Sequence, residues 1–141
     1  MIRTYHGSCH CGAVRYEAVL DLSRETLRCN CTFCRKTRLW KVFVLGDDFR
    51  LLAGEDMLSD YRAPESNWPD GNIHHYFCRH CGVRGFSRGY LDFAPFNGWF
   101  HAVSIATLDD ASDEELATAR VRYENGRDDD HDNAPAETRY L

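Results

Sequence analysis

All seven cysteines of this 141-residue chain stand in three short clusters, and the spacings within each cluster are those of metal ligands. Cysteines separated by one or two residues let a tight turn present their thiolates to a single ion. Four thiolates close the tetrahedral shell of a structural zinc, whereas three leave one coordination position open. The clusters are Cys9 with Cys11, then Cys29 with Cys31 and Cys34, and finally Cys78 with Cys81.

The first and third clusters together supply four sulfurs. Pairing them predicts a complete zinc site of Cys9, Cys11, Cys78 and Cys81 that joins the start of the chain to its middle. Structural zinc contributes about 10–16 kcal/mol of apparent binding free energy. That is comparable to the whole net stability of a domain. We therefore expect this first zinc to hold the fold together.

The middle cluster predicts a second zinc held by Cys29, Cys31 and Cys34. Its fourth ligand is water, a substrate or a histidine, and the absence of a histidine at knuckle spacing from Cys34 favours an open position. Candidate histidines are spread along the chain: His6, His10, His74, His75, His80 and His101. A disulfide framework would leave an odd thiol, and a thioredoxin-like pair at Cys78 and Cys81 would need a βαβ context that is missing.

An open zinc with three thiolates can take a thiol as its fourth ligand and deprotonate it. The thiolate is the nucleophile, so the site suits addition of a small thiol to an aldehyde or a similar small electrophile. Five bases and no acid occupy Arg28 to Lys41, which favours a thiol that carries carboxylates. The alternative is a non-catalytic zinc-binding module, either a thiol carrier or a domain that binds a macromolecule.

The composition indicates one globular domain, and the cysteine clusters add two expected metal sites. Aromatic residues make up 13% of the chain, and no apolar run approaches a membrane span. The N-terminus lacks the apolar stretch of a signal peptide, so a reducing cytoplasm is the expected location. A net charge of -5 makes nucleic acid an unlikely partner, although Phe33 and Trp40 interleave the basic run. The sequence leaves the oligomeric state open.

The pattern along the chain predicts a mainly β fold. Alternation of Val14, Tyr16 and Ala18 with charged residues marks a strand with one solvent-exposed face. Asn67 to Gly71 is expected to be a surface loop. The expected strands are Arg3 to His6, Ala13 to Val19, Trp40 to Leu45, Phe49 to Leu52, Leu58 to Tyr61, Ile73 to Phe77, and Trp99 to Ile105.

One short C-terminal helix is predicted after Ser112, where Glu115 completes a capping box. Beyond Tyr123 the chain becomes acidic, with six acids against Arg127 and Arg139 from residue 124 onward, and it lacks a core pattern. We therefore expect a single zinc-binding domain over residues 1–123 and a loosely ordered acidic tail over residues 124–141.

Four segments of the chain together resemble the glutathione-dependent formaldehyde-activating enzyme family, which also includes centromere protein V. The combined cysteine pattern is highly specific, and the resemblance covers most of Tyr5 to Leu108. The segments are Gly7 to Glu17 (GSCHCGAVRYE), Cys29 to Thr37 (CNCTFCRKT), Phe49 to Asp56 (FRLLAGED) with Tyr61, and Tyr76 to Gly82 (YFCRHCG). After Thr37 the family usually has small residues, whereas this chain has Arg38, Leu39 and Trp40.

The resemblance implies a β-tent fold with zinc sites at the edges of its sheets. It also implies that the first and last cysteine pairs hold a structural zinc, and that Cys29, Cys31 and Cys34 hold the catalytic one. The family's named reaction forms S-hydroxymethylglutathione from glutathione and formaldehyde, and it is classed as a carbon–sulfur lyase. Glutathione, or a similar small thiol, and a small aldehyde are thus the implied partners.

Overall fold

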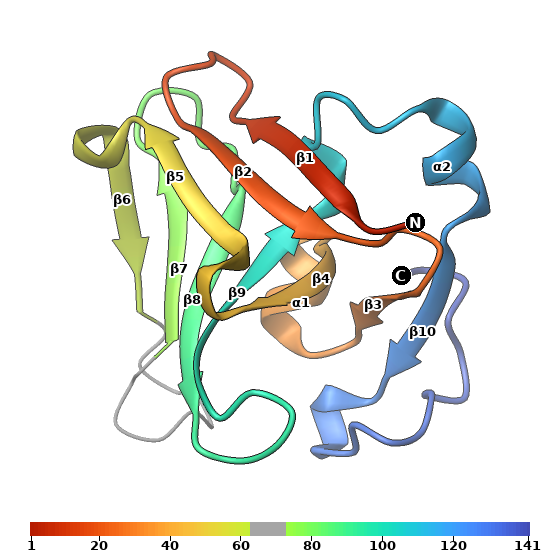
Figure 1. Ribbon diagram of the computed structural model, residues 1–141. Helices are drawn as coiled ribbons and strands as arrows, with labels where there is room; N and C mark the ends of the chain where they lie inside the picture. Colours follow the sequence, from red (N-terminus) through yellow and green to blue (C-terminus); the bar gives the residue numbers. More distant parts are fainter. Residues whose placement is uncertain (63–72) are drawn as a thin grey trace.

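A three-stranded sheet lies across one face of a seven-stranded sheet in the computed structural model, which describes residues 1–62 and 73–141 (Figure 1). The small sheet has the order β1 (Arg3–Ser8), β2 (Arg15–Leu20), β5 (Phe49–Ala53), and both of its pairings are antiparallel. The large sheet has the order β10 (Arg120–Glu124), β3 (Glu25–Cys29), β4 (Trp40–Leu45), β9 (Gly98–Ser104), β8 (Phe86–Leu91), β7 (Ile73–Cys78), β6 (Leu58–Tyr61). The pairing of β10 with β3 is parallel, and the others are antiparallel.

The hydrophobic core lies between the two sheets. Alternate residues of β2, among them Tyr16 and Ala18, are fully buried, and they share one cluster with Val103 and Phe86 of the large sheet. The Tyr16 ring meets the Phe86 ring edge-on at 5.7 Å, and its hydroxyl bonds to Thr107 Oγ1 at 2.7 Å. The predicted alternation in this strand is therefore confirmed, with its charged residues facing away from the core.

The large sheet separates this core from a second layer. In β7, Tyr76 packs on Phe86 in the core. The preceding residue, His75, points to the other face and stacks on Phe33, with 3.7 Å between the ring centroids. Phe33 belongs to α1 (Thr32–Thr37), which therefore lies on the face of the sheet opposite the three-stranded sheet (Figure 1). Side chains on alternate positions of one strand thus serve two different sites.

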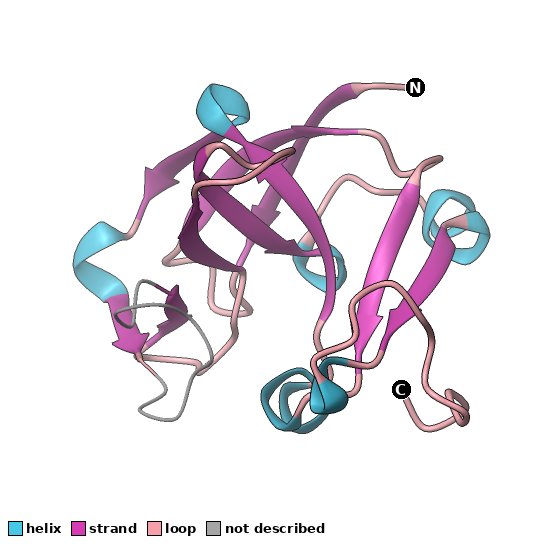
Figure 2. Ribbon diagram, turned by 90° about the horizontal axis from the view of Figure 1, so that it is seen from below, coloured by secondary structure: helices cyan, strands magenta, loops and turns pink. Residues whose placement is uncertain are grey.

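The fold is mainly β, as predicted (Figure 2). Within residues 1–62 and 73–141 it has two short α-helices where the sequence predicted one. The expected one, α2 (Asp113–Thr118), has its capping box: the Glu115 N–H donates to Ser112 Oγ at 3.1 Å, and the Ser112 N–H donates to Glu115 Oε2 at 2.8 Å. The unexpected one is α1, a single polar stretch of six residues without an apolar period. Its cap is Cys31, whose sulfur accepts the Cys34 N–H.

Three strands of the large sheet were not predicted: β3, β8 and β10. In β8 the charged Arg88 stands on the same face as Phe86, and Gly89 on the other face has no room for a side chain, because a Cβ there would lie 2.9 Å from the Phe100 ring. The strand therefore lacks the apolar and polar alternation that marks β2. By contrast, β4 and β6 have the predicted bounds. The expected loop from Asn67 to Gly71 lies outside the described residues.

The tail after Tyr123 is held by hydrogen bonds, so the expectation that it is loosely ordered was wrong. Residue 124 ends β10, and the following turn is closed by hydrogen bonds in both directions between the backbones of Asn125 and Asp130. Further along, the Tyr140 carbonyl accepts a bond from Arg38 Nη1. The tail is therefore held against β3 and α1 by polar contacts. Polar contacts of this kind do not require a periodic pattern of apolar residues, so no sign of them is visible in the sequence. A boundary between domain and tail at residue 123 stays a prediction.

No helix within residues 1–62 and 73–141 has the length and apolar content needed to cross a membrane.

Candidate metal centres

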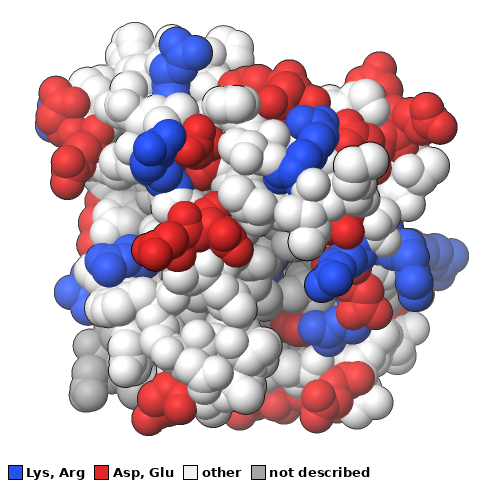
Figure 3. Space-filling view, viewed as in Figure 1, with Lys and Arg blue, Asp and Glu red and all other residues white. Residues whose placement is uncertain are grey.

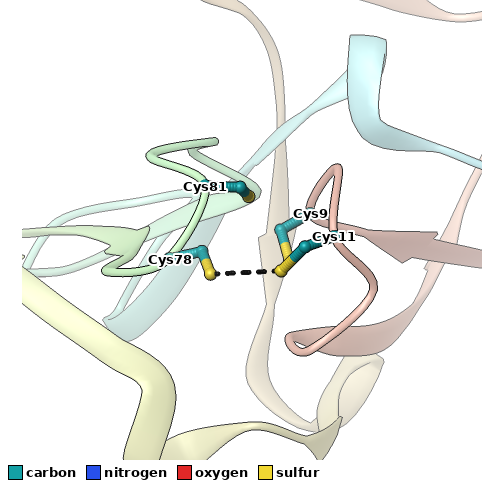
Figure 4. Close-up of side chains that lie close together, drawn as sticks. All are labelled: Cys9, Cys11, Cys78 and Cys81. Atoms are coloured by element: carbon teal, nitrogen blue, oxygen red, sulfur yellow. Dashed lines mark hydrogen bonds between the residues drawn. The ribbon is translucent and has the colours of Figure 1, made fainter.

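The first and third cysteine clusters meet at one end of the molecule and point their sulfurs at a common centre (Figure 4). The Sγ atoms of Cys9 and Cys11 are 3.6 Å apart, and those of Cys11 and Cys78 are 3.7 Å apart. All four sulfurs, including that of Cys81, lie within 4.8 Å of one another. Four ligands at about 2.3 Å from a central zinc lie about 3.8 Å apart, so the donors and the spacing both fit a tetrahedral zinc.

Two similar turns present these sulfurs. The N–H of Cys9 donates to the Val14 carbonyl at 3.0 Å, and the N–H of Cys78 donates to the Val83 carbonyl at 3.0 Å. In each turn a glycine directly follows the second cysteine and adopts a positive φ, 79° at Gly12 and 76° at Gly82. A side chain would strain that conformation, so both glycines are needed for the knuckle geometry.

The second cluster joins the end of β3 to α1. Cys29 is the last residue of the strand, Cys31 caps the helix, and Cys34 lies in its first turn. The Sγ atoms of the three lie within 4.8 Å of one another. Backbone N–H groups point at them, because Cys31 N is 3.4 Å from Cys29 Sγ and Cys34 N is 3.4 Å from Cys31 Sγ. The chain therefore folds these three thiols into a preformed set of soft donors.

No fourth donor completes the second cluster among the residues that the structure describes. No further Cys, His, Asp or Glu joins the three sulfurs within 4.8 Å. The six histidines considered as ligands have other surroundings: His6 contacts Asp110, His74 contacts Asp60, His75 contacts Ser87, His101 stacks on Phe49, and His10 and His80 are exposed. The arrangement matches a site with an open position.

A partly buried cation, Lys41, compensates the sulfur charge of the second cluster. Lys41 Nζ lies 3.6 Å from Cys34 Sγ. Burial works against the charged ammonium, but the negative charges of Cys34, Cys29 and Glu124 outweigh it and raise the pKa of Lys41. Hydrogen bonds from the neighbouring thiols lower the pKa of Cys29, while the contact with Cys29 raises that of Cys34. A divalent ion at the centre would hold all three as thiolates.

The acidic tail forms one wall of the second cluster. Asn30, which is buried between two of the cysteines, donates from Nδ2 to Asn125 Oδ1 at 2.8 Å and accepts the Arg127 N–H at 3.0 Å. Gly126 sits so close that a Cβ there would lie 2.5 Å from Cys29 Sγ. The tail thus reaches the second cluster through its backbone, which no side-chain pattern in the sequence could reveal.

His131 is the histidine that the sequence analysis did not consider. Its Cε1 lies 3.7 Å from the position of a Gly126 Cβ, so it neighbours the second cluster. Its Nδ1 is 3.1 Å from Glu124 Oε2, and its Nε2 is 3.4 Å from Asp129 Oδ1. Burial lowers its pKa, but the bond to Glu124 outweighs this effect and the net pKa is raised. Both ring nitrogens face carboxylates, so His131 supports the tail instead of ligating the cluster.

Replacing Gly126 with alanine is expected to disable the second cluster while sparing the first. The new methyl would need the space of Cys29 Sγ, so Cys29 must move away from its partners. We expect the metal bound per chain to fall by one equivalent, measured by atomic emission on dialysed protein. Gly46→Ala is the matched control, because it lies in open space and only adds strain at φ 54°. Metal content unchanged in Gly126→Ala would contradict the tail's role.

Basic side chains surround a small cavity beside the second cluster. Its lining includes Cys29, Cys34, three arginines of the basic run (Arg28, Arg35 and Arg38) and Leu141 of the tail. Its volume is about 10 Å³, which is close to the minimum that holds one water. Arg38 ends α1 in the left-handed conformation, at φ 55°, where helices usually place glycine. The predicted grouping of bases around these cysteines is therefore confirmed for these three.

The visible surface does not form a basic track. On the face shown in Figure 3, acidic and basic side chains alternate, and no continuous patch of one sign spans the two sheets. Nucleic-acid binding draws on clustered positive charge. This face therefore offers no support for a nucleic-acid partner.

Comparison with known proteins assigns the family. A family model described as glutathione-dependent formaldehyde-activating enzyme matches residues 4–124, a span that includes all seven cysteines. A Halomonas elongata protein whose name places it among these enzymes is 35% identical over 79 residues, covering 53% of this chain and 50% of that protein. The chain thus spans about half the length of this curated relative.

A crystal structure of a Rhodobacter sphaeroides protein has a similar fold, with a TM-score of 0.63 and 25% identity, over 83% of this chain and 99% of that one. With the family model covering most of the chain and the cysteine clusters assembled as that pattern requires, the chain belongs to the glutathione-dependent formaldehyde-activating enzyme family.

Proposed function

We propose that this chain is a zinc-dependent enzyme of the carbon–sulfur lyase type, which handles adducts between a small thiol such as glutathione and formaldehyde or another small aldehyde. Cys9, Cys11, Cys78 and Cys81 would hold a structural zinc. Cys29, Cys31 and Cys34 would hold a second, catalytic zinc. The two sheets that meet near the first cluster would correspond to the β-tent arrangement of the family, and the cytoplasm is the proposed location.

One observation carries the proposal: the second cluster offers three sulfurs and no fourth protein ligand among the described residues. A closed structural site would need four ligands. The first cluster has four and supplies the comparison within the same molecule. Because the two sites differ in this one respect, the second is the one able to accept a ligand from outside.

The reaction adds the S–H of a thiol across the C=O of an aldehyde, so that a carbon–sulfur bond forms and the carbonyl oxygen takes the proton. A zinc ion held by Cys29, Cys31 and Cys34 would supply an open position at which an incoming thiol would lose its proton. Lys41 offsets the negative charge of the sulfurs. Arg28, Arg35 and Arg38 around the small cavity suit a thiol that carries carboxylates, because a guanidinium can bind a carboxylate through two hydrogen bonds.

Metal content and thiol binding, measured together, test this assignment. Protein purified with zinc should contain two equivalents per chain, and cobalt substitution should give a charge-transfer spectrum that responds to glutathione at one of the two sites. Cys31→Ser should remove the responsive signal and leave the other unchanged. One equivalent of metal per chain, or two that are both insensitive to thiols, would rule out an open catalytic zinc.

A second candidate is a thiol carrier that uses the same site without turnover. The cavity beside Cys29 and Cys34, at about 10 Å³, has room for little more than one atom of a ligand, which favours a bound thiol sulfur over a thiol and an aldehyde together. Single-turnover measurements with glutathione and formaldehyde separate the two. An enzyme speeds adduct formation above the rate in buffer, whereas a carrier only shifts the equilibrium in proportion to its own concentration.

A further inference from the structure

A larger cavity lies on the other face of the seven-stranded sheet, away from the second cysteine cluster. Its volume is about 260 Å³, and its walls come from β5, β6 and the core-facing side of β7, β8 and β9. It shares no lining residue with the small cavity at Cys29 and Cys34. An apolar cavity of about 150 Å³ binds benzene, so this one has room for a single ring with a substituent.

Aromatic rings form most of the cavity wall. Phe49 and Phe86 lie with ring centroids 4.7 Å apart, the His101 ring stacks on Phe49 at 3.9 Å, and Tyr76 closes on Phe86 at 5.6 Å. Such rings present flat faces and edges on which another ring stacks favourably. The shape of the wall therefore fits a flat apolar body.

Arg88 places a positive charge on this wall. Its guanidinium carbon lies 4.0 Å from the centroid of the Trp99 ring. No ion pair joins it to an acid among residues 1–62 and 73–141. A half-buried guanidinium keeps free N–H donors in a planar fork, which fits a carboxylate.

His101 is a second polar residue of the cavity wall. Its Nδ1 is buried without a hydrogen-bond partner, the one such side-chain atom found in the described part of the chain. Burial, and then the charge of Arg88, lower the pKa of His101 to about 4, so the ring is neutral at pH 7 and adds no second positive charge. Glu55, which also lines the cavity, disfavours a ligand with two negative charges.

From these contacts we propose that the cavity is a binding site for a small aromatic monocarboxylate, with the ring held among Phe49, Phe86 and Tyr76 and the carboxylate on Arg88. The site shares no lining residue with the cavity at the second cysteine cluster, so its occupation does not require the proposed reaction. A dianionic or phosphorylated ligand is a poorer fit because of Glu55.

Binding of benzoate and benzamide to the zinc-loaded protein tests the site. The two have the same ring and nearly the same shape, and only benzoate carries a charge. In titrations followed by two-dimensional NMR of ¹⁵N-labelled protein, we expect saturable shifts in β8, β9 and the Trp99 indole N–H. Benzamide should bind about tenfold more weakly or worse, since it loses the charge-assisted pair with Arg88.

Variants locate the interaction. Arg88→Gln should weaken benzoate about tenfold and leave benzamide unchanged, whereas Arg50→Gln, an exposed arginine of β5 that pairs with Glu17 at 2.7 Å, should change neither. Leu58→Phe should fill the cavity and abolish both. Equal affinity of the wild-type protein for benzoate and benzamide would overturn the proposal. So would shifts confined to α1 and lost in Cys31→Ser, which would place the acid at the second cluster.

Discussion

Replacing Cys78 with serine is expected to unfold the chain and not merely to inactivate it. Cys78 is almost fully buried, and its sulfur lies 3.7 Å from that of Cys11, so it joins the end of β7 to the turn after β1. A structural zinc at these four cysteines would contribute about 10–16 kcal/mol. Domains of this size have about 5–15 kcal/mol of net stability, so losing the metal removes most or all of it. Circular dichroism at 25 °C should show loss of the β signal.

The control for this prediction is the same substitution in the other cluster. Cys31→Ser removes a sulfur from a cluster that joins neighbouring elements, β3 and α1, and its fold should persist. Removing metal with a strong chelator should reproduce the Cys78→Ser result in the unaltered chain. A melting temperature that does not change with either treatment would show that packing between the sheets suffices without metal.

The cysteine clusters were the part of this molecule most open to prediction from sequence. A zinc ion needs sulfur donors at a few fixed sequence spacings, and these spacings do not depend on the length of the segments between the clusters. The pairing of Cys9 and Cys11 with Cys78 and Cys81 followed from counting, and the structure brings their sulfurs within 4.8 Å. The same reasoning left three sulfurs together, and the structure groups Cys29, Cys31 and Cys34.

What escaped prediction depends on contacts between distant segments. Nothing in the composition of residues 124–141 marks Gly126 as a neighbour of Cys29. The two residues can approach closely because Gly126 has no side chain. The buried polar link from Asn30 to Asn125 is likewise invisible to a search for apolar periods. Helix α1 is too short for a period of its own, and its cap is a cysteine in place of the usual serine or aspartate. It lies where Cys31 and Cys34 meet Cys29.

The two cavities lie on opposite faces of the large sheet. Strand β7 turns His75 toward α1 and Tyr76 toward the core, so one strand lines both the second cluster's side and the 260 Å³ cavity. Strand β9 likewise holds His101 on the core face, with Ala102 and Phe100 on the other. We therefore expect occupation of the 260 Å³ cavity to shift strands that also contact α1. The benzoate titration would show this as shifts in α1 that saturate together with those of Trp99.

Replacing Cys31 with alanine is expected to abolish the proposed thiol–aldehyde reaction while the fold is retained. Cys31 is the half-exposed sulfur of the second cluster, and without it two sulfurs remain for the ion. Adduct formation from glutathione and formaldehyde should fall to the rate in buffer. The zinc content should fall from two equivalents to one, while circular dichroism stays that of the unaltered chain.

Cys31 also caps α1, so its loss has a structural cost that must be separated from the loss of a ligand. Its sulfur accepts the Cys34 N–H, and removing a helix cap costs about 1 kcal/mol. Serine restores an acceptor at the cap but not a soft thiolate. If the sulfur acts as a metal ligand, Cys31→Ser regains stability relative to Cys31→Ala and stays inactive. If activity returns with serine, the helix cap is the essential role, and the second cluster does not carry the chemistry assigned to it.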